Sequence, residues 1–147
     1  YPKFYKMDSL SRLGFVASEL LLEAEGRHPD ATSSDRAVVL FNHSSSVQAD
    51  KAFQASIQDP ADYFPSPAAF VYTLPNIVAG EISIRNHYQG ETSFYVLPAK
   101  DERMMEQVVG ATFNDEHIQS VLGGWLDYQD DTRFEADLFI VENQTLL

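Results

Sequence analysis

Apolar positions near the start of the chain recur at steps of three and four, which is the spacing of one helix face. Asp8 precedes this run and suits an N-terminal cap, while Gly26 follows it and suits a left-handed C-terminal residue. We therefore predict a helix over residues 9–25. The apolar positions that define its inner face are Leu10, Leu13, Val16, Ala17, Leu20, Leu21 and Ala24.

Four later segments have the composition of strands. Residues 36–42, RAVVLFN, are continuously apolar and β-branched between polar neighbours, which is typical of a central strand buried on both faces. Residues 92–97, TSFYVL, are rich in strand-forming side chains. Residues 120–128 and 134–142 are two more strand-like runs, and the acidic residues between them predict an exposed turn.

Further helices are predicted between these strands, over residues 48–58, 75–87 and 101–113. Pro60 ends the first, Pro75 suits the first position of the second, and Asp101 suits the cap of the third. The apolar residues expected to pack in the second of these helices are Ile77, Val78, Ile82 and Ile84. Residues 59–70 are dense in Pro and aromatic residues, and we expect them to cross the surface as irregular chain.

The order helix, strand, helix, helix, strand, helix, strand, strand predicts an α/β fold. We expect one domain over residues 1–147, with a mixed sheet of about four to five strands and helices packed on it. The last two strands follow each other closely, so they predict an antiparallel hairpin at the end.

Charge and composition exclude several functions. The chain has 22 acidic and 10 basic side chains and a net charge of -12, without a basic cluster that could follow a phosphate backbone, so we expect no nucleic-acid partner. No apolar run approaches the roughly twenty residues of a membrane span. The absence of cysteine excludes disulfides, thiolate metal sites and a cysteine nucleophile. Without a segment resembling a secretion signal, we expect a cytoplasmic protein.

The residues 42–46, NHSSS, and nearby Asp50 contain every residue type of a hydrolase triad. Triads are assembled from distant segments, so we favour a Ser-rich turn that caps the next helix. The paired Gly123 and Gly124 lack the pattern of a dinucleotide site and indicate a close backbone approach or a bulge.

We expect neither a metal nor a cofactor. The four histidines, His28, His43, His87 and His117, lack the spacing of a helical zinc motif and are expected at the surface. The acidic residues Asp127, Asp130, Asp131 and Asp137 lack the spacing of a calcium loop, so they predict a solvated turn.

A resemblance covers nearly the whole chain. Residues 4–26 combine a Met-Asp helix start with an acidic end before a Gly, residues 37–46 join a strand to a Ser-rich turn, and residues 66–90 contain Ser-Pro, Pro-Asn and Ala-Gly pairs. In this order the segments resemble the N-terminal half of a β-ketoacyl synthase, a member of the thiolase-like superfamily. The most specific positions are Pro75, Asn76, Ala79, Gly80 and Gly90.

The resemblance implies a thiolase-like half-domain and the position of a nucleophile. In such enzymes an acyl-accepting cysteine begins the helix after the second strand, where the helix N-terminus lowers the pKa of the thiol. The corresponding positions here are Pro98 and Ala99, followed by Asp101 and Glu102, which we expect only to begin a capped helix. The other catalytic groups of these enzymes, two histidines and a lysine, belong to the C-terminal half.

The resemblance also raises a question about the sheet. Members of the family have a further strand before the first helix, and we expect its place to be the middle of the sheet. Two alternatives remain: the four predicted strands close up directly, or a preceding segment supplies the fifth strand, because a buried unpaired sheet edge is costly.

Association is the expected role of the strand 92–97. In enzymes of this family the strand pairs antiparallel with its copy across a two-fold axis, which implies such a contact for Phe94, Tyr95, Val96 and Leu97. The alternative is an internal strand covered by helices.

We therefore expect a non-catalytic ketosynthase-like protein that forms a homodimer, or a heterodimer with a ketosynthase-like chain. Its expected role is that of an accessory subunit in fatty-acid or polyketide-type biosynthesis. One alternative is an acyl-thioester-metabolising enzyme whose reactive groups lie on another chain or segment, and another is a remnant domain without a partner. Acyl carrier proteins are acidic themselves, so we expect at most weak binding to them.

Overall fold

The computed structural model describes residues 1–26, 35–63 and 65–143. The elements are η1 Pro2–Lys6, α1 Ser9–Glu25, β1 Arg36–Asn42, α2 Val47–Ile57, α3 Pro67–Val71, α4 Ile77–Asn86, β2 Thr92–Val96, α5 Glu102–Thr112, β3 Ser120–Asp130 and β4 Arg133–Glu142. Apart from η1 and α3, this is the predicted order of helices and strands. No helix among the described residues is long and apolar enough to cross a bilayer.

The sheet has four strands in the order β2-β1-β3-β4. β1 is parallel to both β2 and β3, whereas β3 and β4 form the predicted antiparallel hairpin. Every residue of β1 is buried, which confirms that it is a central strand. β1 pairs directly with β3 from Arg36↔Ser120 to Phe41↔Trp125, so the four strands close up and leave no gap in the middle.

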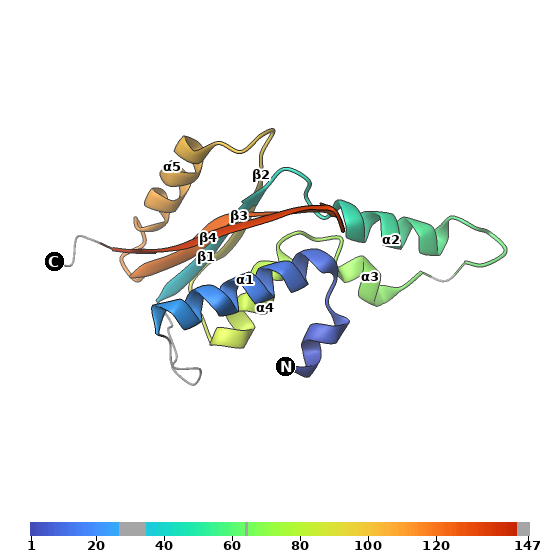
Figure 1. Cartoon of the computed structure of the whole chain (residues 1–147), viewed down its shortest axis with the longest axis horizontal. Coiled ribbons are helices and arrows are strands. Elements are labelled where there is room, and N and C mark those ends of the chain that lie inside the picture. Colours follow the sequence, from blue (N-terminus) through green and yellow to red (C-terminus); the bar gives the residue numbers. More distant parts are fainter. Residues whose placement is uncertain (27–34, 64, 144–147) are drawn as a thin grey trace.

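Helices cover both faces of the sheet, with α1 and α4 on one face and α5 on the other (Figure 1). Alternate residues of β1 point to opposite faces. Val38 and Leu40 therefore join a core cluster with Leu22 and Ile82, and the alternating residues Val39 and Phe41 join a second cluster. The members of the second cluster include Met105, Val109, Val121 and Trp125.

Three apolar positions of α1, Val16, Leu20 and Ala24, are exposed although the sequence predicted them to face inward. Val16 and Leu20 are 45% and 63% exposed. They lie four residues apart and therefore share one stripe of the helix, on the side away from the sheet. Leu10 and Leu22 lie on the opposite side and are buried.

The helix α4 starts two residues later than predicted. Pro75 and Asn76 lie in the turn before it, and Asn76 is the N-cap residue. Val78 and Ile82 are four residues apart and buried, but Ile84 is 60% exposed because two further residues turn its side chain to the opposite side. The prediction that Pro75 begins the helix and that Ile84 packs inward was wrong.

The residues 59–70 were expected to be irregular throughout, but their last part belongs to α3. Pro67 begins this short helix, and the hydroxyl of Ser66 accepts a hydrogen bond from the backbone N–H of Ala69. A Ser-Pro pair is a known helix-start signal, which the expectation overlooked. In Figure 1, α2 and the chain that follows it extend away from the sheet, and the ring of Phe53 contacts that of Phe70 at 5.4 Å.

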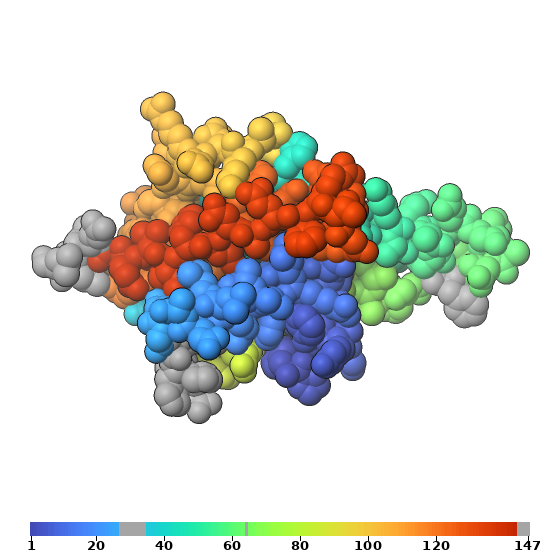
Figure 2. All heavy atoms as spheres, in the orientation of Figure 1, coloured from blue at the N-terminus to red at the C-terminus, as the bar shows by residue number. Residues whose placement is uncertain are grey.

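The strand β4 lies at one edge of the sheet, and β2 lies at the other. Figure 2 shows β4 running along the front of the molecule next to α1. The two edges therefore lie on opposite sides of the sheet, and the parallel strands β1 and β2 end together, with Asn42 opposite Val96.

Candidate functional site

The candidate site is the corner between β2 and α5, which contains the positions that the sequence resemblance singled out. The backbone N–H of Leu97 donates to the carbonyl of Asn42 at 2.7 Å, which continues the pairing of β2 with β1. The Nδ1 of His43 forms a hydrogen bond of 2.9 Å with the carbonyl of Leu97. These two bonds tie the corner to the loop that follows β1.

Neither of the two positions that the resemblance assigns to the nucleophile carries one. Pro98 and Ala99 are both exposed and carry only apolar side chains. Asp101 caps α5, because its carboxylate accepts the backbone N–H of Met104 at 3.0 Å, and Glu102 occupies the first turn. The predicted capped start is confirmed. The positive end of the helix dipole therefore meets two carboxylates of the chain itself.

Lys100 holds the corner against the hairpin. Its Nζ lies 2.9 Å from Glu135 Oε1 and 3.5 Å from Asp137 Oδ2, and 5.9 Å from the ring centre of Trp125. The hydrogen bond to Glu135 raises the pKa of Lys100. Sequence reasoning missed this contact, because only the pairing of β4 with β3 brings Glu135 and Asp137 near a residue about 35 positions earlier.

The loop after β1 is anchored by Asp127, which is a buried residue of β3. Its Oδ1 accepts the backbone N–H groups of His43 at 3.1 Å and Ser44 at 2.8 Å, and its Oδ2 accepts the Ser44 hydroxyl at 3.1 Å. The side chain of Asn42 also bonds both backbone groups of Ser45, which has a φ of 52°. Asp127 is therefore a structural anchor, and the prediction that it belongs to a solvated turn was wrong.

The residues 42–46 do not assemble a triad. The His43 ring bonds the Leu97 carbonyl, and the Ser44 hydroxyl donates to Asp127. The Ser46 hydroxyl donates to the carbonyl of Thr73 at 2.6 Å. Ser46 is the N-cap residue of α2, but its hydroxyl makes no capping hydrogen bond. The loop is structural, as we favoured, although the expected side-chain cap is absent.

Among the described residues, the remaining candidate ligands do not gather into one metal site. His87 is the left-handed C-cap of α4, His117 is exposed in the loop before β3, and His28 lies outside the described residues. Of the acidic residues near the hairpin turn, Asp130 pairs with Arg133 and Asp131 bonds the Tyr128 hydroxyl. Across residues 1–26, 35–63 and 65–143, no three His, Cys, Asp or Glu side chains are placed to share a metal ion.

Three of the glycines, Gly90, Gly123 and Gly124, mark close backbone approaches. A Cβ on Gly123 would lie 2.6 Å from the carbonyl oxygen of Val39. Gly124 has a φ of 134°, and a Cβ there would lie 2.2 Å from the carbonyl oxygen of Asp137. A Cβ on Gly90 would lie 2.4 Å from the carbonyl oxygen of Arg36. The predicted close approach at the paired glycines is therefore confirmed.

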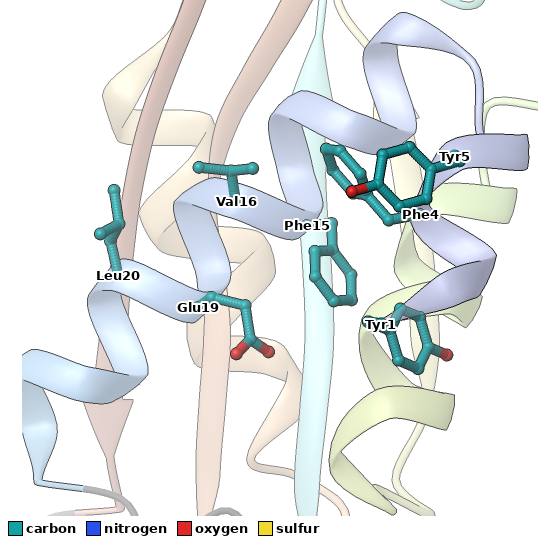
Figure 3. A pocket seen from close by; sticks show the side chains of 7 residues that line it. All are labelled: Tyr1, Phe4, Tyr5, Phe15, Val16, Glu19 and Leu20. Atoms are coloured by element: carbon teal, nitrogen blue, oxygen red, sulfur yellow. The ribbon is translucent and has the colours of Figure 1, made fainter.

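Two apolar pockets lie away from the corner. One, of about 300 Å³, lies on η1 and α1, where the ring of Tyr1 stacks on Phe15 at 5.0 Å (Figure 3). Its carboxylate, Glu19, is paired with Arg85 at 3.2 Å. The other, of about 510 Å³, lies between α5 and β4. The residues that line it are Glu106, Val109, Gly110, Phe113, Phe139, Val141, Glu142 and Asn143, so it contains no hydroxyl or imidazole group.

Comparisons with known proteins identify the fold. No protein-family model and no curated protein matches the sequence. Among solved structures, the ishigamide ketosynthase/chain length factor matches with a TM-score of 0.78 and 20% identity, over 97% of this chain and 45% of that chain. A ketosynthase in complex with its chain length factor, from Xenorhabdus doucetiae, matches with a TM-score of 0.61 and 18% identity, over 86% of this chain and 49% of that chain.

The chain thus spans about half the length of the structures it matches. Sequence identities this low establish the fold and leave the activity to be tested. The predicted fold class is confirmed: the chain has the thiolase-like α/β fold of ketosynthase and chain length factor structures.

Proposed function

We propose that this protein is a non-catalytic ketosynthase-like chain that acts by associating with a ketosynthase-like partner. Its role would be that of an accessory subunit in fatty-acid or polyketide-type biosynthesis. The observation that carries the proposal is the corner between β2 and α5. Pro98 and Ala99 stand at the positions that the resemblance assigns to the acyl-accepting cysteine, and neither can form a covalent acyl intermediate.

The surroundings of the corner also support a structural role. Asp101 and Glu102 place negative charge where a thiolate would need positive potential. Lys100, the nearest cation in sequence, pairs with Glu135. The imidazole of His43 bonds the backbone of the corner. The polar groups around this corner therefore hold the loops in place.

The strand β2 supports the associative part of the proposal. It lies at an edge of the sheet, and its residues Tyr95 and Val96 are 40% and 48% exposed. An apolar strand at an open edge is a template for pairing with another chain. The two solved structures described above are each a ketosynthase with a chain length factor, which makes a ketosynthase-like chain the partner to test first.

An acylation experiment tests the absence of catalysis. The wild-type protein is incubated with an acyl thioester and its intact mass is measured; we expect no increase. The matched control is Ala99→Cys, which should react with a thiol-alkylating reagent because Ala99 is exposed. That reaction would show that reagents reach the corner. A covalent acyl adduct on the wild-type chain would contradict the proposal and favour the acyl-thioester enzyme.

A second experiment tests association. Light scattering over a range of concentrations, with and without a ketosynthase, measures whether complexes form. Val96→Lys places a charge on the open edge of β2 and should weaken them. The matched control is Leu20→Lys, which changes a still more exposed apolar residue on α1 and should have no effect. A monomer under all conditions would contradict the proposal and favour a remnant domain.

Binding to an acyl carrier protein is expected to be weak. The chain carries a net charge of -12, and carrier proteins are acidic as well, so the two surfaces repel each other. Titration calorimetry at physiological salt should detect no saturable binding. A measurable affinity under these conditions would contradict this expectation.

A further inference from the structure

We infer that the open edge of β4 accepts an extended segment of a partner protein as an additional strand, and that this segment is apolar at one end and basic at the other. β4 lies at the opposite edge of the sheet from β2. The inferred surface is therefore separate from association through β2 and goes beyond the function proposed above. It follows from the apolar end of β4, residues 138–141.

This end of β4 has the composition of a central strand but lies at an edge. Residues 138–141, LFIV, are apolar on both faces of the sheet, which is typical of a strand buried on both faces. Leu138 and Ile140 pack against the first core cluster, and Phe139 and Val141 pack against the second. All four residues are only half-buried. Both cores are therefore incompletely covered along the same edge.

Apolar surface flanks this edge on both faces of the sheet. On the face of α5, the pocket of about 510 Å³ lies next to Phe139 and Val141. On the face of α1, Leu13 and Leu21 are half-buried and pack against the same core cluster as Leu138. Figure 2 shows β4 uncovered along the front of the molecule, next to α1. The side chains of an added strand would therefore meet apolar side chains on either face.

The outer side of β4 presents the backbone groups that an added strand needs. The backbone N–H of Asn143 donates to the carbonyl of Gln119 at 2.8 Å, and the hairpin register is regular from Glu142 back to Phe134. In an antiparallel pair, the residues that exchange hydrogen bonds with the neighbour alternate along the strand. The odd-numbered residues of β4 therefore direct their backbone groups to β3, and the even-numbered residues direct theirs outward. Among the described residues, no strand pairs with this outer side.

The charges on the other half of β4 select a basic partner. The side chains of Glu135 and Asp137 are 54% and 67% exposed, and both carboxylates share the ammonium of Lys100. Two negative charges thus face one positive charge. A lysine or arginine opposite each carboxylate stabilises a paired strand, whereas an acidic residue there destabilises it. The net charge of -12 also favours the approach of a cationic segment.

A second copy of β4 fits this edge less well. An antiparallel pair of two β4 strands that includes all the outward-facing residues is centred on Leu138. Glu135 then lies opposite Val141 and Asp137 lies opposite Phe139, so carboxylates are placed against apolar side chains. The two copies also repel each other through their net charges. A segment that is apolar against residues 138–141 and basic against the acidic half has neither disadvantage.

A labelled peptide, KVIVVKTK, tests the inference on the wild-type protein. Paired antiparallel to β4, its first residue lies opposite Glu142 and its last opposite Glu135, so the middle lysine meets Asp137. Fluorescence anisotropy should show saturable binding that weakens as the salt concentration is raised. The matched control, EVIVVETE, should not bind. No saturable binding of the lysine peptide, or equal binding of the two peptides, would overturn the inference.

Methylated peptides test whether binding is strand pairing. The third residue of the peptide lies opposite Ile140 and directs its N–H to β4, whereas the N–H of the fourth residue points away from β4. Methylation of the third nitrogen should weaken binding by about tenfold or more, because it leaves a carbonyl of β4 unpaired. Methylation of the fourth nitrogen should change the affinity little. Equal affinities of the two methylated peptides would overturn the addition of a strand.

Variants of the protein locate the site at β4. Ala136→Pro removes an outward N–H, which proline replaces without loss of the pairing to β3, and should abolish peptide binding. Ala136→Val keeps this N–H and should bind as the wild type does, and so should Val96→Lys at the other edge. An unchanged urea midpoint shows that Ala136→Pro is folded; if the midpoint falls, the methylated peptides give the same test on the wild-type chain.

Two outcomes with these variants would contradict the inference. Peptide binding that is lost in Val96→Lys and retained in Ala136→Pro would place the site at β2. Self-association of the wild-type chain that disappears in Ala136→Pro, measured by light scattering, would show that a second copy occupies β4. The association proposed for β2 would stand if the peptide failed to bind, because β2 lies at the opposite edge of the sheet.

Discussion

Replacing Arg36 by methionine should destabilise the fold by removing a buried network at the start of β1. The guanidinium donates to Ser120 Oγ at 2.7 Å and to the two carboxylate oxygens of Glu25 at 3.0 and 2.9 Å. It also lies 3.4 Å from the hydroxyl of Tyr88. Arg36 thereby joins the end of α1 to β1, β3 and the segment before β2.

The charge of Arg36 is stable in this position. Burial acts to lower its pKa, but the hydrogen bonds to Glu25 and Tyr88 outweigh this effect, and the pKa of Arg36 is raised. The guanidinium is therefore charged at every accessible pH. The loss of stability in Arg36→Met should therefore not depend on titration of Arg36.

The magnitude follows from the burial of the partners. Removing one member of a buried ion pair costs about 3 to 5 kcal/mol. The Glu25 side chain is 32% exposed and can regain water, which places the loss near the lower limit. Methionine fills the space of the aliphatic stem of Arg36, so no large cavity adds to the loss of stability. We expect the free energy of unfolding to fall by about 3 kcal/mol, which lowers Tm by about 6 to 12 °C.

Urea denaturation measures this change, with the fluorescence of the buried Trp125 as the signal. The matched control is Arg36→Lys, which keeps the charge but loses the paired contact with Glu25, and its stability should be intermediate. An Arg36→Met variant as stable as the wild type would refute the reasoning, since the network would then contribute no net stability.

Three further changes test other parts of the structure. Gly124→Ala should lower the free energy of unfolding by at least about 3 kcal/mol, because φ is positive at this position and the new Cβ would meet the carbonyl oxygen of Asp137. Equal urea midpoints for the variant and the wild type would contradict this expectation. Asp101→Ala removes the cap of α5 and should lower the free energy of unfolding by about 1 kcal/mol, measured in the same way. Burial raises the pKa of Asp8 from its ordinary 3.8, so the folded protein holds this proton more tightly than the unfolded chain does. The free energy of unfolding therefore falls as the pH rises from the pKa of Asp8 in the unfolded chain to its pKa in the folded protein. Asp8→Asn retains the cap and avoids this loss, so its stability relative to wild type should increase between about pH 4 and about pH 7; a constant difference would show that Asp8 does not titrate in this way.

Local patterns predicted the secondary structure well. Residues 36–42 were predicted as a buried strand and form β1 with the same bounds. Asp8 and Asp101 were predicted as caps, and both accept the expected backbone hydrogen bonds. The resemblance also predicted the corner at Pro98 and Ala99, which lies between β2 and α5 as expected.

Some of the misses have a common cause. The anchoring of the loop by Asp127 depends on a side chain from another element. The contact of Lys100 with Glu135 joins residues 35 positions apart, and that of Ser44 with Asp127 joins residues 83 apart. No window of adjacent residues contains this information.

The sequence by itself determined which segments form helices and strands, and that no cysteine is present to carry an acyl group. Caps, helical spacing and β-branched runs act over a few residues, so they can be recognised without coordinates. Only the tertiary structure decided the strand order, the direct pairing of β1 with β3, and the open edge at β2. Those features depend on hydrogen bonds between strands that are distant along the chain, and such pairing is decided by the packing of the whole domain.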